Sequence, residues 1–181
     1  MTRFGYVMAT SIATMGIATA AFLPLPLKLV WNASASAPIG LYAIDSDALP
    51  EVSDLVAVDA PEPLAAFLAK RGYLPRGVPL MKRVAAVAGQ RVCRTGRTIS
   101  VDGTDMAEAL DHDRLGRTLP SWQGCRVITV GEVFLMNGQV RDSLDGRYFG
   151  PLSTDTIIGR ATPLYTAEDG NGRFQWRAPT R

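Results

Sequence analysis

The sequence predicts a mostly β domain with one short helix, carried on one N-terminal transmembrane helix. Three observations lead to this fold class: short runs rich in β-branched residues recur along the chain, turn residues separate them, and a long uncharged segment precedes them. The chain has 181 residues, of which 47% are hydrophobic and 20% charged, a composition typical of a globular protein. Enough residues follow the N-terminal segment for one domain with its own core.

The N-terminal segment from Phe4 to Leu23 contains no charged residue and follows Arg3 directly. Its length suits a membrane span, whereas the apolar region of a secretory signal peptide usually has about 7–15 residues. Pro24 then stops the helix, and Trp31 suits the headgroup region. We therefore expect residues 1–31 to form a membrane anchor and interface segment, with the following domain outside the cytoplasm.

A cleaved signal peptide is the alternative for this region, because the pattern Ala-x-Ala occurs at 33–35 and again at 35–37. Signal peptides end in such small-residue sites. Cleavage after Ala35 would leave Ser36 at the new N-terminus, and cleavage after Ala37 would remove it. The sequence leaves both alternatives open.

Eight short segments have the composition of strands, and turn residues bound them. They are residues 40–44, 54–58, 79–87, 90–94, 98–101, 125–130, 132–137 and 156–165. Val101-Asp102-Gly103 is typical of a tight hairpin turn.

One helix is expected from Pro63 to Arg71, because Leu64, Phe67 and Leu68 share a face and Gly72 can stop the helix. The polar, turn-rich residues 105–124 are expected to form an inserted loop. The β-rich domain then covers residues 32–167, and residues 168–181 form a tail without a motif.

The composition argues against several functions. The net charge is +2 and basic residues are scattered among acidic ones, so no nucleic-acid partner is expected. Cys93 and Cys125 do not form a CxxC motif, and with a single histidine they cannot complete a usual zinc site. No cofactor is expected. In an oxidising compartment we expect a disulfide between the two cysteines, with two buried free thiols as the alternative.

Lys82 is a candidate functional residue because it lies in an apolar strand. Strand alternation places Lys82 on one face with Leu80, Val84 and Ala86. Burial disfavours the ammonium and lowers the pKa, so such a lysine can act as a neutral base near pH 7. From alternation alone, the alternative is a lysine at a sheet edge that extends its amine into solvent.

Ser36 is the candidate nucleophile, since Ser-Lys pairs are a recognised solution for activating serine. Pro38 and Gly40 give a stiff turn in which the Ser36 N–H can face a substrate carbonyl. Ser34 projects to the same side of an extended chain and can offer its hydroxyl as a second oxyanion donor. The residues alone leave open that both serines are solvated linker residues.

His112, the only histidine, lies between two aspartates in the polar insert. A general base must be held in place by packing, so a His112-based triad is not expected.

A third polar segment, residues 141–151, groups Ser143, Asp145 and Arg147 beside aromatic residues. It predicts a shell of side chains that orients the site, and the alternative is a turn closed by an Asp145–Arg147 ion pair.

Taken together, these segments resemble the type I signal peptidase family, membrane-anchored serine proteases with a Ser-Lys dyad. The run MKRVAAVAGQRV (81–92) is similar to the family's Lys-Arg box, and DSLDGRYFGP (142–151) is similar to its Asp-Ser-x-Asp-Ser-Arg-Tyr-aromatic-Gly box. The resemblance implies a signal-peptidase-like β-rich catalytic domain. It also implies roles for residues of all three segments: Ser36 as nucleophile, Lys82 as general base, Ser34 at the oxyanion hole, and Ser143, Asp145 and Arg147 as supporting residues.

Within that family, Pro38 two residues after Ser36, with GRTLPSWQGC (116–125) and GEVFLMN (131–137) downstream, is similar to the TraF-type conjugative-transfer peptidases. Members of that branch process pilin subunits for type IV secretion, and some join the cut end to the pilin N-terminus. The resemblance implies a bacterial inner-membrane enzyme with a periplasmic catalytic domain. Its implied partners are a pro-pilin or another exported precursor peptide and the lipid bilayer.

The sequence departs from the family pattern at two places. NGQV (137–140) replaces a Gly-Asp-Asn that precedes the last box, and Gly146 replaces a serine. Both departures concern the residues that support Lys82. A general type I signal peptidase and a non-catalytic periplasmic component of the transfer apparatus stay open as alternatives.

Overall fold

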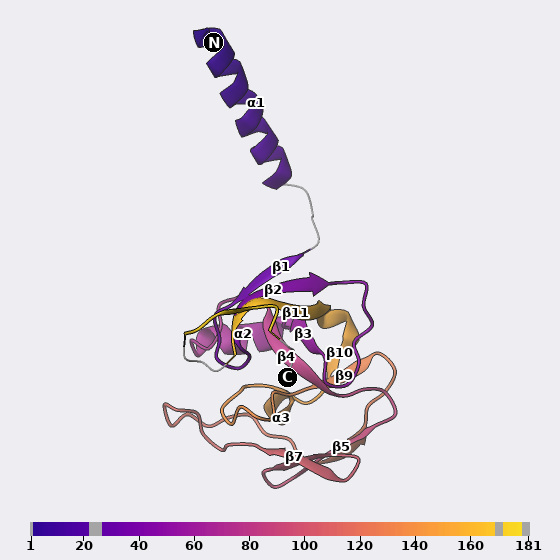
Figure 1. Ribbon diagram of the computed structural model, residues 1–181. Coiled ribbons are helices and arrows are strands. Elements are labelled where there is room, and N and C mark those ends of the chain that lie inside the picture. The colour runs from indigo at the N-terminus through magenta and orange to yellow at the C-terminus, as the bar shows by residue number, and fades with distance from the viewer. Residues whose placement is uncertain (1, 22–26, 169–171, 179–181) are drawn as a thin grey trace.

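The computed structural model of the protein describes residues 2–21, 27–168 and 172–178. Two antiparallel β-sheets make up most of it, together with a few helices (Figure 1). The larger sheet consists of β1 (Leu29–Asn32), β2 (Ile39–Asp45), β3 (Leu55–Val58), β4 (Leu80–Ala86), β9 (Glu132–Leu135), β10 (Leu152–Ser153), β11 (Ile157–Ala167) and β12 (Gln175–Trp176). The smaller sheet consists of β5 (Arg91–Thr95), β6 (Thr98–Val101), β7 (Thr104–Glu108) and β8 (Gly124–Val127). The helices are α1 (Arg3–Ala21), α2 (Glu62–Lys70), α3 (Gly146–Phe149) and a 3-10 turn, η1 (Thr154–Thr156).

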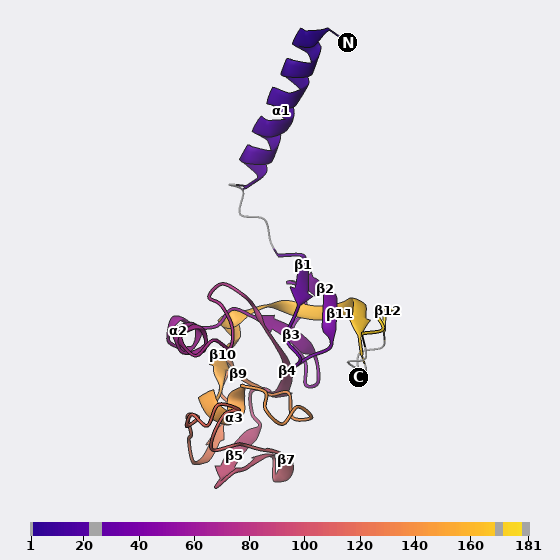
Figure 2. The same ribbon diagram turned by 90° about the vertical axis from the view of Figure 1, so that its left-hand side faces the viewer.

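The strand order brings segments that are far apart in sequence side by side. In the larger sheet the order is β1-β2-β11-β3-β4-β9-β10, with β12 paired to β11. The order in the smaller sheet is β7-β6-β5-β8. The chain passes from the larger to the smaller sheet between β4 and β5, and Figure 2 shows β5 and β7 at the end of the domain farthest from β1.

The core lies on both faces of the larger sheet, because β3 is buried at every position. Leu55 and Ala57 of β3 pack in a cluster that includes Tyr42. Val56 and Val58 point to the opposite face, as alternation requires, and pack in a second cluster. In β4 the side chain of Val84 belongs to this second cluster, and Lys82 points to the same face.

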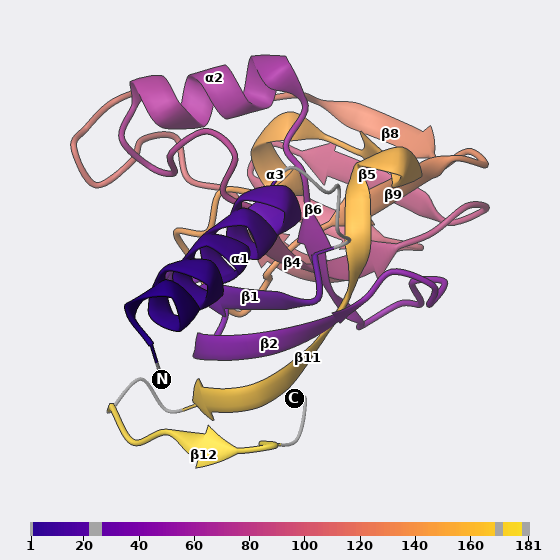
Figure 3. The same cartoon turned by 90° about the horizontal axis from the view of Figure 1, so that it is seen from above.

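The mostly β fold with a short helix is confirmed, and each of the eight expected strands corresponds to an observed one. The expected helix appears as α2, which lies at the outside of the domain when the molecule is viewed from above (Figure 3). The expected hairpin turn joins β6 and β7, with positive φ at Asp102 (49°) and Gly103 (82°) as tight hairpin turns require.

Four strands lie where the sequence did not predict any: β1, β7, β12 and the two-residue β10, which pairs with β9. β7 lies almost entirely within the expected loop. It was not predicted because its residues are almost all exposed, so its sequence pattern has no apolar face. β1 begins within the expected interface segment, residues 1–31, and ends one residue beyond it; its alternate residues Val30 and Asn32 are buried against the domain. β12 lies in the expected tail and pairs with Tyr165 and Thr166 of β11.

The N-terminal segment forms α1, a helix of 19 residues that stands apart from the sheets in Figures 1 and 2. Positions 22 and 23 of the expected span lie outside the described residues. Among the residues that the structure describes, no helix combines the length and the apolar character needed to cross a membrane. The expected transmembrane helix is thus not shown.

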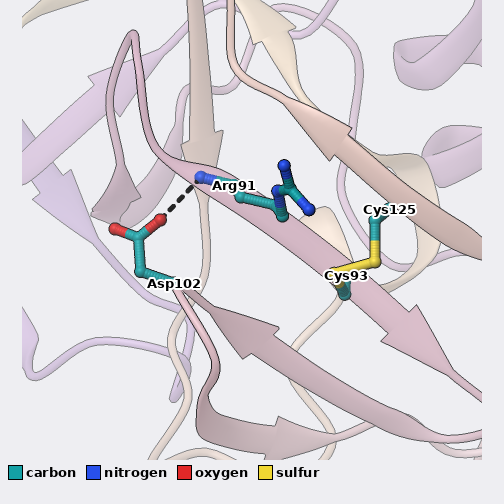
Figure 4. The surroundings of a disulfide bond; sticks show 4 residues. All are labelled: Arg91, Cys93, Asp102 and Cys125. Atoms are coloured by element: carbon teal, nitrogen blue, oxygen red, sulfur yellow. Dashed lines mark hydrogen bonds between the residues drawn. A yellow bond between two sulfur atoms is a disulfide. The ribbon is translucent and has the colours of Figure 1, made fainter.

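A disulfide joins Cys93 of β5 to Cys125 of β8, which lie directly opposite each other in the smaller sheet (Figure 4). On the other edge of β5, the backbone N–H of Arg91 donates to the Asp102 carboxylate at 2.8 Å. The disulfide fixes the end of the polar segment that precedes β8, so this segment is tied to the sheet although much of it is irregular.

Candidate active site

Ser36 and Lys82 lie next to each other, with Lys82 Nζ 3.4 Å from Ser36 Oγ. Ser36 belongs to the tight turn between β1 and β2, and Lys82 lies in the middle of β4. The sheet order thus brings the predicted nucleophile and the predicted base within reach of one hydrogen bond. Such a separation allows proton transfer between a nucleophile and its base after a small adjustment.

Lys82 is buried, with 4% of its surface exposed. It faces the apolar core and does not extend its amine into solvent, because β4 lies between β3 and β9 and is not a sheet edge. Burial lowers the pKa of Lys82 from 10.5 to about 8; Asp145 acts in the opposite direction, and Arg147 lowers the pKa further. A substantial fraction of the amine is therefore neutral near physiological pH.

Lys82 has a second polar partner, Ser143, whose Oγ accepts a hydrogen bond from Nζ at 2.9 Å. Ser143 lies in the loop that precedes α3 and is itself buried. The amine is therefore held between two serine hydroxyls, one in the β1–β2 turn and one in the third sequence segment.

The turn that carries Ser36 is organised by Asn32, a buried residue at the end of β1. Its Oδ1 accepts from the Ser34 N–H at 3.0 Å and from the Ser34 hydroxyl at 2.9 Å, which is the Asx-turn arrangement. Its Nδ2 donates to the carbonyls of Ser34, Ala37 and Pro38. One side chain thus bonds four polar backbone groups of this turn and fixes its shape.

Ser34 Oγ lies 3.1 Å from Ser36 Oγ. The hydroxyl proton of Ser34 has two acceptors within reach, Asn32 Oδ1 and Ser36 Oγ. Within the described part of the chain, the backbone N–H of Ser36 donates no hydrogen bond, so it is available to a ligand. The turn therefore presents an N–H and a nearby hydroxyl beside the Ser36 oxygen.

Asn137, which follows β9 closely in the chain, connects the Ser36 turn to β4. Its Nδ2 donates to the Ser36 carbonyl at 2.6 Å and to the Met81 carbonyl at 3.0 Å, and its Oδ1 accepts from the Arg83 N–H at 2.9 Å. Asn137 is buried, with 6% of its surface exposed. A single amide therefore contacts Ser36 and both residues that flank Lys82.

Asp145 and Arg147 form a buried, bidentate ion pair, with Nε–Oδ1 and Nη2–Oδ2 distances of 2.9 Å. Arg147 also donates to several backbone carbonyls that precede it in the chain, those of Glu108, Val140, Arg141 and Ser143. These bonds hold the loop that places Ser143 against Lys82. Asp145 influences Lys82 through its charge and accepts from the Asn137 N–H at 3.0 Å.

Gly146, which replaces a serine of the family pattern, has no room for a side chain. A Cβ at this position would lie 2.6 Å from Cε2 of Phe134 and 2.8 Å from the Leu135 carbonyl oxygen. Trp122, whose ring contacts that of Phe134 edge to face, donates its indole N–H to the Gly146 carbonyl at 3.0 Å. The departure from the pattern is thus explained by aromatic packing against this turn.

A cavity of about 360 Å³ opens beside Ser36. Small residues of the Ser36 turn line it on one part of its wall, and residues 137–140 line another. Arg83 and Glu168 add opposite charges to the lining.

Asn32 and Asn137 are site residues that the sequence pattern did not predict. Asn32 carries a recognisable signal, since an asparagine directly before a run of small residues favours an Asx-turn. No comparable signal exists for the contacts of Asn137, because its partners lie up to 101 positions away.

His112 is exposed and pairs with Thr118 in an isolated β-bridge. The residues that the structure describes contain no cluster of side chains suited to a metal ion.

Comparison with known protein families gives one match over most of the chain. Residues 1–166 match the family described as "Signal peptidase, peptidase S26". A crystal structure of a signal peptidase I from Enterococcus faecalis V583 aligns with 62% of this chain and 97% of its own at 17% identity, with a TM-score of 0.38.

Two curated relatives are similar over most of their length. A "Probable conjugal transfer protein TraF" of Sinorhizobium fredii is 38% identical over 75% of this chain and 76% of its own. A "Plasmid transfer protein TraF" of Escherichia coli is 32% identical over 78% of both chains. Both similarities exceed what a shared fold alone produces.

Proposed function

We propose that this chain, which belongs to the signal peptidase family, peptidase S26, is a serine endopeptidase that uses Ser36 as nucleophile and Lys82 as general base. The observation that carries the proposal is the pairing of Ser36 Oγ with a buried lysine amine at 3.4 Å. Because the pKa of that lysine is lowered to about 8, its neutral form is accessible under ordinary conditions. An activated serine next to such a base is the arrangement that nucleophilic catalysis requires.

Acylation proceeds from this arrangement in two steps. Lys82 takes the proton of the Ser36 hydroxyl while Oγ forms a bond to the scissile carbonyl carbon, and the carbonyl oxygen becomes an oxyanion. Collapse of this intermediate breaks the C–N bond, and the Lys82 ammonium returns the proton to the leaving amine. The acyl group stays on Ser36 as an ester.

The oxyanion is stabilised by the Ser36 N–H, which is available for bonding within the described residues. The Ser34 hydroxyl, 3.1 Å from Ser36 Oγ, is the second donor after its proton turns away from Asn32. Ser143 keeps the amine of Lys82 in place through both proton transfers, and Asp145 and Arg147 support the loop that carries it.

A pro-pilin of a conjugative transfer system is the proposed substrate. The curated relatives are named as conjugal and plasmid transfer proteins, and a cavity that can receive part of a peptide opens beside Ser36. The acyl-enzyme has two fates. Attack by water activated by Lys82 gives a linear product, and attack by the pilin's own α-amine gives a cyclic one. We propose that the chain is capable of both.

The proposed location is the bacterial inner membrane, with the catalytic domain in the periplasm. The Cys93–Cys125 disulfide supports an oxidising compartment. Retention of the N-terminal segment is supported by β1, because cleavage after Ala35 or Ala37 would remove a strand with two buried side chains. N-terminal sequencing of the mature chain and protease digestion of intact spheroplasts test these points. A mature N-terminus at Ser36 or Pro38, or a domain protected in spheroplasts, would contradict the proposal.

The activity is tested with a pro-pilin and a pre-secretory protein presented to the full-length chain in one assay. Wild-type enzyme should process the pro-pilin, whereas Ser36→Ala and Lys82→Ala variants that remain folded should not. Preference for the pre-secretory protein would identify a general signal peptidase instead. Unchanged processing by both variants would refute Ser36 and Lys82 as the catalytic pair, and a wild-type chain that processes neither protein would identify a role without catalysis. Mass spectrometry of the product distinguishes a linear pilin from a cyclic one, which is lighter by one water.

A further inference from the structure

We propose that Asn137 is a positioning residue that sets the distance between the nucleophile and the general base. This inference rests on the proposed function of Ser36 and Lys82. It adds a third element to that function, a side chain that bonds the backbone on which each of the two residues is carried.

Asn137 extends the hydrogen bonding along one edge of β4. Antiparallel pairing of β4 with β9 leads up to Asn137, since the Met136 N–H donates to the Arg83 carbonyl at 2.8 Å. Beyond that point the Asn137 side chain continues the ladder. Its amide accepts from the Arg83 N–H and donates to the Met81 carbonyl, the two groups that a neighbouring strand would bond along the same edge. The β4 backbone is thereby held on both sides of Lys82.

Asn137 also holds the Ser36 turn. The same Nδ2 that bonds Met81 donates to the Ser36 carbonyl at 2.6 Å. The backbone of the nucleophile is therefore connected to the backbone that carries the base through one planar group. Movement of the turn away from β4 requires this bond to break, whereas the longer Lys82–Ser36 contact at 3.4 Å holds the turn less firmly.

Asn137 is itself fixed in place. Its backbone N–H donates to Asp145 Oδ2 at 3.0 Å, and Asp145 is held in turn by the buried pair with Arg147. The ion pair thus supports the dyad by two routes: one through Ser143 to the amine of Lys82, and the other through Asn137 to both backbones.

Contact with substrate is the competing role, because Asn137 also lines the cavity beside Ser36. The hydrogen bonds of its side chain argue against this role. A primary amide has two N–H donors, and these serve Ser36 and Met81, while its oxygen serves Arg83. Asn137 therefore has no unused donor to offer to a peptide.

The experiment compares Asn137→Ala and Asn137→Asp with the wild-type full-length chain in detergent. The aspartate keeps an acceptor for the Arg83 N–H, removes both donors and adds a charge, whereas the alanine removes the donors without adding a charge, so a loss common to both variants reports the bonds to Ser36 and Met81. The matched control is Gln123→Glu, because the Gln123 amide also bonds one backbone N–H and one carbonyl, both of Gly96 beside the smaller sheet. Two rates are measured: phosphonylation of Ser36 by a small alkyl fluorophosphonate, in which Oγ forms a bond to phosphorus and fluoride leaves, and cleavage of a pro-pilin peptide.

Both rates are taken on the alkaline plateau of each variant's pH profile, so that a changed Lys82 pKa does not contribute. We expect both rates to fall about 100-fold in the two Asn137 variants, the loss that a misplacement of about 1 Å produces, and to stay unchanged in Gln123→Glu. Fluorophosphonate labelling at the wild-type rate, with only peptide cleavage impaired, would assign Asn137 to substrate binding and overturn the proposal. A loss no larger than the loss of folded protein, measured by circular dichroism in the same samples, would also overturn it. A wild-type chain that neither cleaves the pro-pilin peptide nor reacts with the reagent at Ser36 would instead refute the proposed function.

Discussion

Lys82 Nζ and Ser143 Oγ lie 2.9 Å apart in the protein interior, closer than Nζ lies to the Ser36 oxygen. A neutral amine carries two protons and one lone pair. When Ser143 accepts one of the protons, the direction of the lone pair is restricted, and the Ser36 hydroxyl is the nearby group that can donate to it. The contact between Lys82 and Ser143 therefore orients the base as well as holding it.

The lowered pKa of Lys82 predicts the pH dependence of the proposed cleavage. Because burial lowers this pKa to about 8, the ammonium is the major form at pH 7 and the neutral base is the major form at pH 9. We expect kcat/KM for a pro-pilin peptide to rise with pH through a midpoint near 8. Circular dichroism at each pH controls for unfolding. A midpoint near the ordinary lysine value would contradict the assignment of Lys82 as the base.

The same buried lysine has a cost in stability that depends on pH. Below pH 8 Lys82 is protonated in both the folded and unfolded states, so the folded state bears the full cost of a buried charge, about 3 kcal/mol. Between about 8 and 10.5 the folded state releases its proton first, and the cost declines. Lys82→Met should therefore raise the melting temperature at pH 7, and this gain should shrink as the pH approaches 10. Parallel melting curves of both proteins measure it; a gain that is constant or grows with pH would refute the prediction.

A buried and an exposed ion pair should differ sharply in their contributions to stability. Asp145 and Arg147 have side chains at most 1% exposed, so Asp145→Asn leaves a buried, unpaired guanidinium. We expect the free energy of unfolding to fall by about 3–5 kcal/mol. The matched control is Glu62→Gln in the pair with Arg76, whose side chains are 72% and 62% exposed, and its effect should stay below about 1 kcal/mol. Urea titrations measure the free energy of unfolding of both variants. Equal losses in the two variants would disprove the structural role of the buried pair.

Gly40, just after the Ser36 turn, is a position where a side chain should not be tolerated. It has a φ of 150°, and a Cβ there would lie 2.2 Å from the Tyr165 carbonyl oxygen on β11. Gly89 has a φ of 91°, and no atom lies within 4 Å of the place that its Cβ would take, so Gly89→Ala carries the backbone cost alone, about 1–2 kcal/mol. Gly40→Ala should lower the unfolding free energy by more than this and should also slow Ser36 acylation. If thermal melts rank the two variants equally, the close packing of β2 on β11 is not important for stability.

Much of the site could be predicted from the sequence, because the spacing of apolar residues indicates which side chains are buried. Alternation in the β4 segment predicted that Lys82 has apolar neighbours, and the structure finds it buried. The hydrogen bonds of Asn137 could not be predicted in this way, since the sequence around a polar residue at a strand end is the same whether its side chain bonds water or Ser36. β7 was not predicted for a related reason: its residues are exposed, so the strand has no apolar face that a sequence pattern could indicate.

The Ala-x-Ala motifs around Ser36 have a consequence for the enzyme itself. An extended chain with this pattern suits a protease that prefers small residues, and under the proposed function a second copy of this chain is such a protease. In the fold, however, the carbonyls of Ser34, Ser36, Ala37 and Pro38 are engaged by Asn32 and Asn137, and the backbone forms a tight turn. A protease must bind its substrate as an open strand, so we expect the folded chain to resist self-digestion at this sequence and an unfolded chain to be cleaved there.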